Sequence, residues 1–256
     1  MEPITTRGTH VREHTSVLAD AEKRLLIRIA RRMPAAVNSD HLTALGATAM
    51  VAAGGAFAAA SVDRRALYLV PVLLAVNWFG DSLDGTVARV RGHQRPRYGY
   101  YLDHVVDLVT TIALFAGLAL SGLMQPMLAA LVLLGYVLLC AESFLATHTV
   151  GVFRLAFSGM GPTELRILLA VGALVATTRH TVSVAGLLEL PLFDIGGWVA
   201  VVGMGAVFVL SACRNARALY LAEPLPGKAP RTPDSKLRLA VRSVFLPRFA
   251  GRWSGR

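Results

Sequence analysis

Charged residues are scarce in this sequence, and their scarcity excludes an ordinary soluble domain. Asp, Glu, Lys and Arg together make up 16% of the 256 residues, whereas about 25% is usual in soluble domains. Hydrophobic residues make up 54%, and long stretches carry almost no charge while both ends are dense in Lys and Arg. The composition therefore predicts an all-α, polytopic membrane protein built as one helix bundle.

Cysteine is almost absent. Cys140 and Cys213 both fall inside apolar segments, which excludes a disulfide framework or a cysteine-based zinc cluster and leaves two buried free thiols. The first thirty residues are polar, so we expect no cleavable signal peptide.

Acidic residues are fewer than basic ones, which gives a formal net charge of +10. Such a balance can indicate nucleic-acid binding. Here the basic residues flank apolar spans, so anionic lipid head groups explain them more simply. We therefore expect membrane lipids as partners and no nucleic acid.

Six apolar segments, each of roughly the 17–25 residues that cross a bilayer, follow one another along the chain. They lie near His41–Ala60, Ala66–Ala88, Tyr100–Leu120, Pro126–Ala146, Thr163–Thr178 and Gly196–Leu221. The sequence thus predicts three parts. Residues 1–37 form a polar arm with a juxtamembrane helix, 38–221 form a six-helix domain, and 222–256 form a basic cytoplasmic tail.

The segments that flank the six spans carry their own patterns. AEKRLLIRIARRM (Ala21–Met33) has the spacing of a basic amphipathic helix, which suits a membrane surface. Its apolar positions are Leu25, Leu26, Ile29 and Met33. The tail is expected to be disordered, and docking on lipid through LRLAVRSVFLPRF is the alternative.

Arginines gather in the connection between the second and third spans, at positions 89, 91, 95 and 97. Cytoplasmic connections carry an excess of Lys and Arg. We therefore expect both termini and this connection on the cytoplasmic side of the membrane. If the source is bacterial, this membrane is the plasma or inner membrane.

Four aspartates interrupt the apolar pattern in GDSLDGTVARVRGHQRPRYGYYLDHVVD. Asp81 and Asp84 are three residues apart, and Asp103 and Asp107 are four apart, so each pair shares one face of a helix. The short connection makes the two spans antiparallel neighbours. All four carboxylates can then converge near the cytoplasmic end of the bundle.

Such a cluster needs positive partners, because a single Asp at the centre of a membrane helix costs roughly 2.5–3.5 kcal/mol. Arginines are one candidate. Divalent ions are the other, because an all-oxygen site suits Mg²⁺, Mn²⁺ or Ca²⁺, and two such ions suit phosphoryl chemistry. Gly85 and Ala88 keep the helix face shallow enough for a flat ligand, and Arg89 is placed to reach a phosphate.

Two stretches, DSLDGTVAR and GYYLDHVVD, resemble the signature of the CDP-alcohol phosphotransferase family, Asp-x-x-Asp-Gly-x-x-Ala-Arg followed by Gly-x-x-x-Asp-x-x-x-Asp. All eight fixed positions are present: Asp81, Asp84, Gly85, Ala88, Arg89, Gly99, Asp103 and Asp107. SDHLTALG (Ser39–Gly46) is similar to the family's Pro-Asn-x-x-Thr entry to its first span, with Ser39 and Asp40 in place of Pro and Asn.

The resemblance implies a metal-dependent transferase of phospholipid biosynthesis. Such an enzyme moves a phosphatidyl or phospho-alcohol group from a CDP-linked donor, here expected to be CDP-diacylglycerol, to an alcohol acceptor and releases CMP. By position, Asp81, Asp84, Asp103 and Asp107 would bind two ions of Mg²⁺ or Mn²⁺. Asp107 would also act as general base. The resemblance further leads us to expect a homodimer.

The nucleotide pocket implied by the resemblance consists of Gly85, Ala88, Arg89 and Gly99. The choice of substrates stays open. His104 and GPTE (Gly161–Glu164) are similar to the choline and ethanolamine branch, which joins a CDP-aminoalcohol to diacylglycerol. In that branch His104 would be the alternative base, although an interfacial hydrogen-bonding role is the plainer interpretation.

Three charged residues near the fifth span are candidates to bind the acceptor: Arg154, Glu164 and Arg166. The arginines favour a phosphorylated acceptor and Glu164 a cationic amine, while ordinary interfacial charges explain all three equally well. Asn77, one turn before Asp81 on the same face, is a further candidate to touch the ligand.

Two other classes of protein are weighed against the enzyme. A cation transporter explains buried carboxylates but not the interleaved Gly85, Ala88 and Arg89. A non-catalytic membrane scaffold would be expected to have lost some of the four aspartates.

Overall fold

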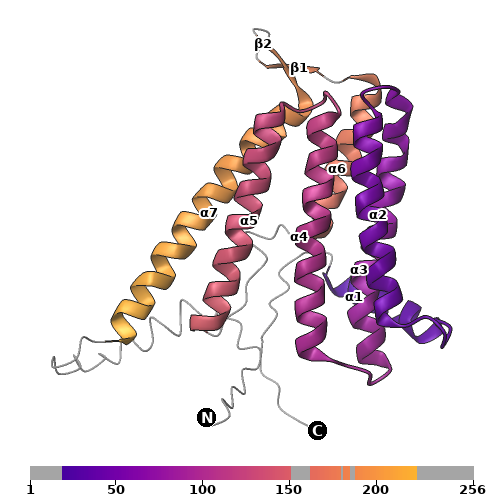
Figure 1. The fold of residues 1–256 in the computed structure, drawn as a ribbon, viewed down its shortest axis with the longest axis vertical. Coiled ribbons are helices and arrows are strands. Elements are labelled where there is room, and N and C mark those ends of the chain that lie inside the picture. The colour runs from indigo at the N-terminus through magenta and orange to yellow at the C-terminus, as the bar shows by residue number, and fades with distance from the viewer. Residues whose placement is uncertain (1–18, 151–161, 180, 185–187, 224–256) are drawn as a thin grey trace. The chain divides into compact units, whose positions relative to one another are not determined.

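The described part of the chain is helical, with one short hairpin (Figure 1). The structure is a computed structural model that describes residues 19–150, 162–179, 181–184 and 188–223. The elements are α1 (Ala19–Arg32), α2 (Ser39–Ala59), the 3₁₀ helix η1 (Arg64–Tyr68), α3 (Leu69–Val90), α4 (Pro96–Leu120), α5 (Pro126–Val150), α6 (Pro162–Thr178), β1 (Thr181–Val184), β2 (Leu188–Pro191) and α7 (Leu192–Ala222). The expected polar arm before residue 19, Arg154 and the basic tail from residue 224 lie outside the described residues.

Five helical segments of the described residues are long and apolar enough to cross a membrane. They are Ser39–Ala59, Arg64–Val90, Pro96–Leu120, Pro126–Thr149 and Leu192–Ala222. Their positions confirm the predicted all-α, polytopic membrane bundle. The remaining predicted span coincides with α6, whose 17 residues rise only about 25 Å, less than the roughly 30 Å of a hydrocarbon core. The count of six spans therefore stays a prediction.

The chain divides into two compact units, and the boundary after Phe208 falls within α7. The first unit holds α1 to α6, the hairpin and the beginning of α7. In it α2 packs against α3 and α4, α4 against α5, and α3 against α1 and α6. The second unit begins at Val209, and its described part is the last stretch of α7, where Asn215 donates a hydrogen bond of 3.4 Å to Ser211.

Glycines let α2 approach its two neighbours at backbone distance. A Cβ added to Gly80 of α3 would lie 2.5 Å from the carbonyl oxygen of Leu42 and 2.6 Å from the amide nitrogen of Gly46. A Cβ on Gly117 of α4 would overlap the carbonyl of Gly54. Small residues at membrane-helix interfaces permit such close approach. The contact at Gly80 matters most here because Asp81 follows it directly.

Large apolar side chains fill the rest of the first unit. The largest fully buried ones include Phe57, Leu67, Leu74, Leu118 and Leu128. Phe57 also meets Phe193 edge to face, with ring centroids 5.7 Å apart. This packing holds α2, α3 and α4 in one fixed arrangement.

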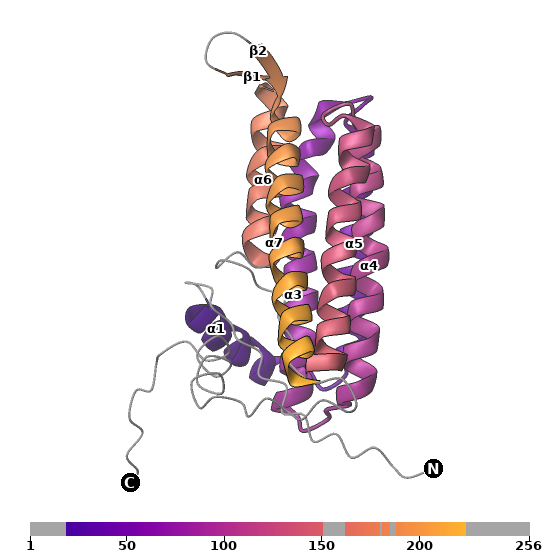
Figure 2. The same cartoon turned by 90° about the vertical axis from the view of Figure 1, so that its left-hand side faces the viewer.

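The predicted amphipathic helix forms as α1 and lies beside the lower end of α3 (Figure 2). Part of its apolar face is buried within the protein: Leu26 and Ala30 pack against Leu42, Leu83 and Val87. Leu25, in contrast, is 45% exposed. The apolar face is therefore shared between packing on the bundle and the outside, and contact of α1 with a membrane surface stays a prediction.

Arg91, directly after α3, fastens the segment that joins α1 to α2. Its guanidinium donates hydrogen bonds to the carbonyl oxygens of Val37 (2.5 Å), Met33 (2.9 Å) and Pro34 (2.8 Å). These carbonyls belong to the segment that directly follows the end of α1 at Arg32. Arg91 thus binds α1 to the end of α3 that carries the aspartates.

The connection from α3 to α4 is also joined to the start of α2. Arg95 donates to both carboxylate oxygens of Asp40, at 3.0 and 2.8 Å, and its guanidinium lies 4.2 Å from the centre of the Tyr98 ring. The hydrogen bond that Arg95 donates to Asp40 raises the pKa of Arg95, so this arginine stays charged. Because both partners are largely exposed, their contribution to stability is small.

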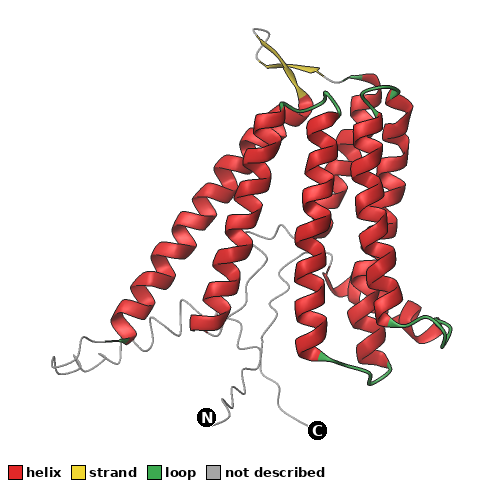
Figure 3. Cartoon of the chain, in the orientation of Figure 1, coloured by secondary structure: helices red, strands yellow, loops and turns green. Residues whose placement is uncertain are grey.

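A β-hairpin joins α6 to α7, where the sequence indicated only a polar connection around Glu189 (Figure 3). β1 and β2 are antiparallel, with Thr181 opposite Pro191 and Val184 opposite Leu188. The β-branched residues of TVSV favour a strand. Strands of four residues are too short to give a clear alternating pattern, which is why the sequence did not reveal them.

Candidate active site

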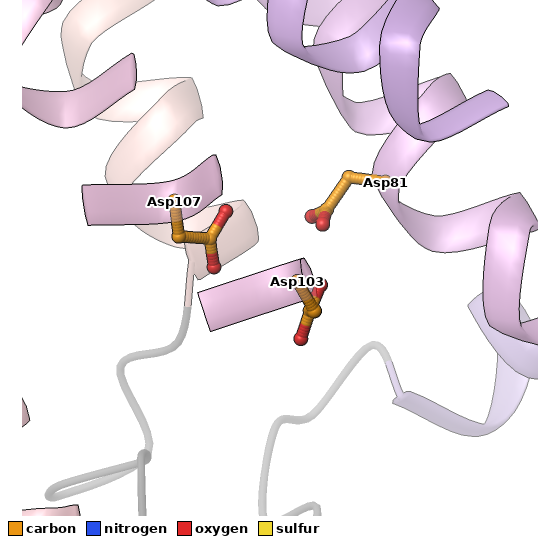
Figure 4. Close-up of side chains that lie close together, drawn as sticks. All are labelled: Asp81, Asp103 and Asp107. Atoms are coloured by element: carbon orange, nitrogen blue, oxygen red, sulfur yellow. The ribbon is translucent and has the colours of Figure 1, made fainter. Parts of the chain in front are cut away.

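Three of the four predicted aspartates gather between α3 and α4 (Figure 4). Asp81 extends from α3, and Asp103 and Asp107 from α4. One carboxylate oxygen from each lies within 4.8 Å of the others, and all three side chains are half-buried. The helical spacing inferred from the sequence therefore brings together three carboxylates from two helices that both pack against α2.

This donor set fits a divalent ion. Carboxylate oxygens are the ligands that Mg²⁺ and Mn²⁺ prefer, and three converging anions are unfavourable without a cation. Asp81, Asp103 and Asp107 are thus the residues that would hold a metal. The acidic group supports a divalent-metal site, while the identity and number of the ions stay predictions.

Asp84 lies beside this group and is held by other partners. Its carboxylate accepts a hydrogen bond of 2.7 Å from Thr43 Oγ1 of α2 and another from the backbone amide of Gly85. Its backbone carbonyl oxygen accepts a hydrogen bond of 3.0 Å from Ser39 Oγ. Contacts with α2 therefore fix the orientation of Asp84, and its role as a metal ligand stays a prediction.

All four aspartates line one cavity. Its walls come from α2, α3 and α4: Thr43, Gly46, Ala47, Asn77, Asp81, Asp84, Asp103, Val106, Asp107 and Thr110. Thr43 and Gly46 belong to SDHLTALG, which the sequence related to the entry of the first span. Sequence reasoning did not assign Thr43 a role, although its place in that motif was a usable signal.

Arg166 reaches this cavity from α6. Its Nη2 donates to Asp81 Oδ2 at 2.6 Å, and its Nε donates to Asn77 Oδ1 at 2.7 Å. Asn77 is 5% exposed, and its amide donates in turn to the carbonyl of Gly46 at 3.0 Å. Arginine is thus a cation for the aspartate cluster, as the sequence allowed, and Asn77 contacts this arginine.

Of the other candidates for the acceptor, Glu164 is not among the residues that line the cavity. Glu164 lies in the first turn of α6, two residues before Arg166, so helical geometry turns it about 200° away from that arginine. Arg154 is outside the described residues.

His104 lies between α4 and α5 and does not line the described cavity. Its ring stacks on Tyr100 with centroids 4.2 Å apart and lies 5.2 Å from the ring of Phe144. Its Nδ1 is 2.8 Å from the Tyr100 carbonyl and 3.4 Å from Asp103 Oδ2. Of the two candidate bases, Asp107 is the one whose side chain borders the cavity.

The predicted nucleotide residues flank the aspartates. Arg89 donates to Thr86 Oγ1 at 2.9 Å and folds over Gly85, where an added Cβ would lie 3.1 Å from Arg89 Nη1. Gly99 is exposed one turn before Asp103, and a Cβ there would meet nothing within 4 Å. Open backbone is thus found at Gly99, whereas the Arg89 guanidinium lies against Gly85.

Comparison with known protein families gives a match to the CDP-alcohol phosphatidyltransferase family over residues 38–211, about two thirds of the chain. An archaetidylinositol phosphate synthase of Pyrococcus horikoshii is 36% identical over 67 residues, which are 26% of this chain and 35% of that protein. The chain thus matches about a third of the length of this curated relative.

A solved structure shares the fold. Mycobacterium tuberculosis phosphatidylinositol phosphate synthase, solved with CDP-DAG bound, superposes with a TM-score of 0.55. The alignment covers 75% of this chain and 94% of that protein at 23% identity. At this identity the likeness establishes the fold alone.

Proposed function

Since this chain belongs to the CDP-alcohol phosphatidyltransferase family, we propose that it transfers a phosphatidyl group from CDP-diacylglycerol to the hydroxyl of an alcohol and releases CMP. The family match confirms the resemblance predicted from the aspartate signature and supports this class of reaction. The observation that carries the proposal is the convergence of Asp81, Asp103 and Asp107 in one cavity.

The proposed reaction is a displacement at the phosphorus of the phosphatidyl group. The acceptor oxygen forms a bond to this phosphorus, the bond from phosphorus to the CMP oxygen breaks, and CMP leaves with the electron pair. Divalent ions, when bound, neutralise the diphosphate and the charge that develops on CMP. We assign the acceptor proton to Asp107, because its carboxylate borders the cavity whereas His104 is stacked against Tyr100.

The remaining residues of the signature orient the donor in this proposal. Gly85, Ala88 and Gly99 form the nucleotide pocket, in which Gly99 offers open backbone, and Arg89 binds the phosphate of the nucleotide. Thr43 keeps Asp84 in one orientation through the hydrogen bond between their side chains. Such residues contribute to the reaction mainly by positioning the reacting groups, rather than by binding the substrate more strongly.

We further propose that the acceptor is itself phosphorylated, with inositol phosphate as the first compound to test. Arg166 places a guanidinium against Asp81 and Asn77, two residues that line the cavity, and its planar fork suits phosphate. Both relatives described above are synthases of a lipid inositol phosphate. A CDP-aminoalcohol donor with diacylglycerol as acceptor is the second candidate, favoured by the His104 and GPTE motifs of the sequence.

The chain is an integral membrane protein, and we propose that the cavity opens to the cytoplasm. The support is charge: Arg91, Arg95 and Arg97 follow the end of α3 that carries Asp81 and Asp84, and cytoplasmic connections are rich in such residues. A cysteine at the exposed Gln94 tests this. Labelling by a membrane-impermeant maleimide only after the membrane is opened supports the proposal, and equal labelling of intact cells contradicts it.

The decisive experiment measures CMP release by the purified chain in detergent. The assay supplies labelled CDP-diacylglycerol, Mg²⁺ or Mn²⁺, and inositol phosphate, glycerol phosphate, inositol or serine, with CDP-choline and diacylglycerol as the reverse pairing. We expect CMP release that EDTA and Asp107→Asn abolish. Asp63→Asn is the matched control, because Asp63 caps η1 beyond the other end of α2.

Each rival has its own outcome in this experiment. No CMP from any pairing, with divalent-ion binding intact, contradicts the transferase and favours a scaffold. Ion flux into liposomes that depends on the same aspartates favours a transporter.

A further inference from the structure

Arg166 and a divalent ion require the same carboxylate. Arg166 Nη2 lies 2.6 Å from Asp81 Oδ2, and Asp81 is one of the three residues whose oxygens lie within 4.8 Å of one another. A guanidinium at hydrogen-bonding distance from one oxygen of this group repels any second cation that binds there. The ion pair therefore bears directly on how tightly the aspartates hold a metal.

The position of Arg166 is fixed from a second side. Asn77 Oδ1 accepts a hydrogen bond of 2.7 Å from Arg166 Nε, and the Asn77 amide is itself tied to the Gly46 carbonyl of α2 at 3.0 Å. Asn77 is 5% exposed, and the Arg166 side chain is 12% exposed. A buried amide with both ends occupied is a rigid support, so the guanidinium is directed at Asp81 rather than into solvent.

We propose that Arg166 is a built-in counter-ion that stabilises the aspartate cluster without metal and weakens the affinity of the cluster for divalent ions, and that Asn77 is its positioning residue. The two effects have opposite signs. Removing the charge of Arg166 leaves the carboxylates repelling one another, which destabilises the protein without metal. The same change removes a competing cation, which tightens metal binding.

The opposite signs separate this role from a merely structural one. If Arg166 served only to hold α6 on α3, its loss would loosen the cluster and weaken metal binding together with stability. If Arg166 oriented Asp81 for the metal, its loss would also weaken binding. Only a competing cation makes the ion bind more tightly when it is removed.

The test measures Mn²⁺ binding by electron paramagnetic resonance on the full chain in detergent, using the loss of the signal of free aqueous Mn²⁺. We expect Arg166→Gln to bind Mn²⁺ about tenfold more tightly, the change that about 1.4 kcal/mol of removed repulsion produces. We also expect it to unfold at a lower temperature in EDTA than the unchanged protein does. Arg179→Gln is the matched control, since Arg179 is an exposed arginine directly after the other end of α6.

Two further variants test the proposal if Arg166→Gln does not fold. Arg166→Lys keeps the charge and is expected to keep the Mn²⁺ affinity within about threefold, because the ammonium still repels the ion. Asn77→Ala releases the guanidinium without removing it and is expected to tighten binding by a smaller factor than Arg166→Gln.

Unchanged or weaker Mn²⁺ binding in Arg166→Gln, or in Asn77→Ala if that is the variant that folds, overturns the proposal. The measurement needs no donor or acceptor. A chain that shows these changes in metal affinity but releases no CMP supports the counter-ion and contradicts the proposed transferase.

Discussion

Thr43 of α2 donates a 2.7 Å hydrogen bond to the carboxylate of Asp84 of α3. A hydrogen bond to a charged group contributes about 1.5–3 kcal/mol, and here it fixes the orientation of one aspartate beside the three that converge. Thr43 thereby brings α2 into a site whose sequence signature lies entirely on α3 and α4.

Replacing Thr43 by Val keeps the shape of the side chain and removes the donor. We expect CMP release to fall about tenfold, because a freed Asp84 no longer holds one orientation and about 1.4 kcal/mol corresponds to a tenfold change in rate. Thr48→Val is the matched control, since Thr48 donates only to Ala44 of its own helix, at 2.8 Å. Equal activity in both variants would show that the Thr43 hydrogen bond has no part in the reaction.

The identity of the base is tested by comparing Asp107→Asn with His104→Asn. General bases contribute about 10²–10⁴-fold to rates, so Asp107→Asn is expected to lose at least about a hundredfold in kcat. His104→Asn is expected to lose less than tenfold through a disturbed Asp103, whose carboxylate lies 3.4 Å from the imidazole. The reverse ranking of the two rates would make His104 the base.

Gly80→Ala is expected to destabilise the protein. The new methyl group would lie 2.5 Å from the carbonyl oxygen of Leu42, and such overpacking costs about 1–3 kcal/mol. Gly55→Ala serves as the comparison, because a Cβ at Gly55 of α2 meets nothing within 4 Å and alanine favours a helix by about 1 kcal/mol. In thermal unfolding measured in detergent, we expect a lower midpoint temperature for Gly80→Ala and not for Gly55→Ala. A midpoint of Gly80→Ala at or above that of the unchanged chain is incompatible with the close contact.

Arg91→Ala should loosen α1. The variant loses the three hydrogen bonds to the carbonyls of Met33, Pro34 and Val37, which we expect to lower stability by about 2 kcal/mol. Limited proteolysis should then cut between α1 and α2 faster. Arg91→Lys, which keeps the charge but not the planar fork, should give an intermediate rate. Protection equal to that of the unchanged protein would mean that the apolar contacts of α1 suffice to hold it.

Periodicity and composition located the helices of the bundle because membrane spans need long, uncharged runs. The predicted starts of the first and third spans, His41 and Tyr100, lie within the helices that begin at Ser39 and Pro96. The exact first residues of these helices were harder to predict, because they depend on local geometry. Pro96 lies within the first turn of α4, and Asn38 caps the N-terminus of α2.

Spacing along single helices predicted the aspartate cluster, since Asp103 and Asp107 must share a face. It did not predict the different position of Asp84, which depends on Thr43 some forty residues earlier in the chain. Nor did it predict that Arg166 and Asn77 bind one another. These contacts depend on how α2 and α6 pack on α3, and no short-range pattern encodes such packing.

The backbone contact between Gly46 and Gly80 has a consequence for the cost of binding. With no side chain between α2 and α3 at this point, the separation of the walls that carry Thr43 and Asp84 does not depend on any rotamer. The ordering of these walls is completed when the chain folds, so a substrate that enters later loses less of its binding free energy to immobilising the protein.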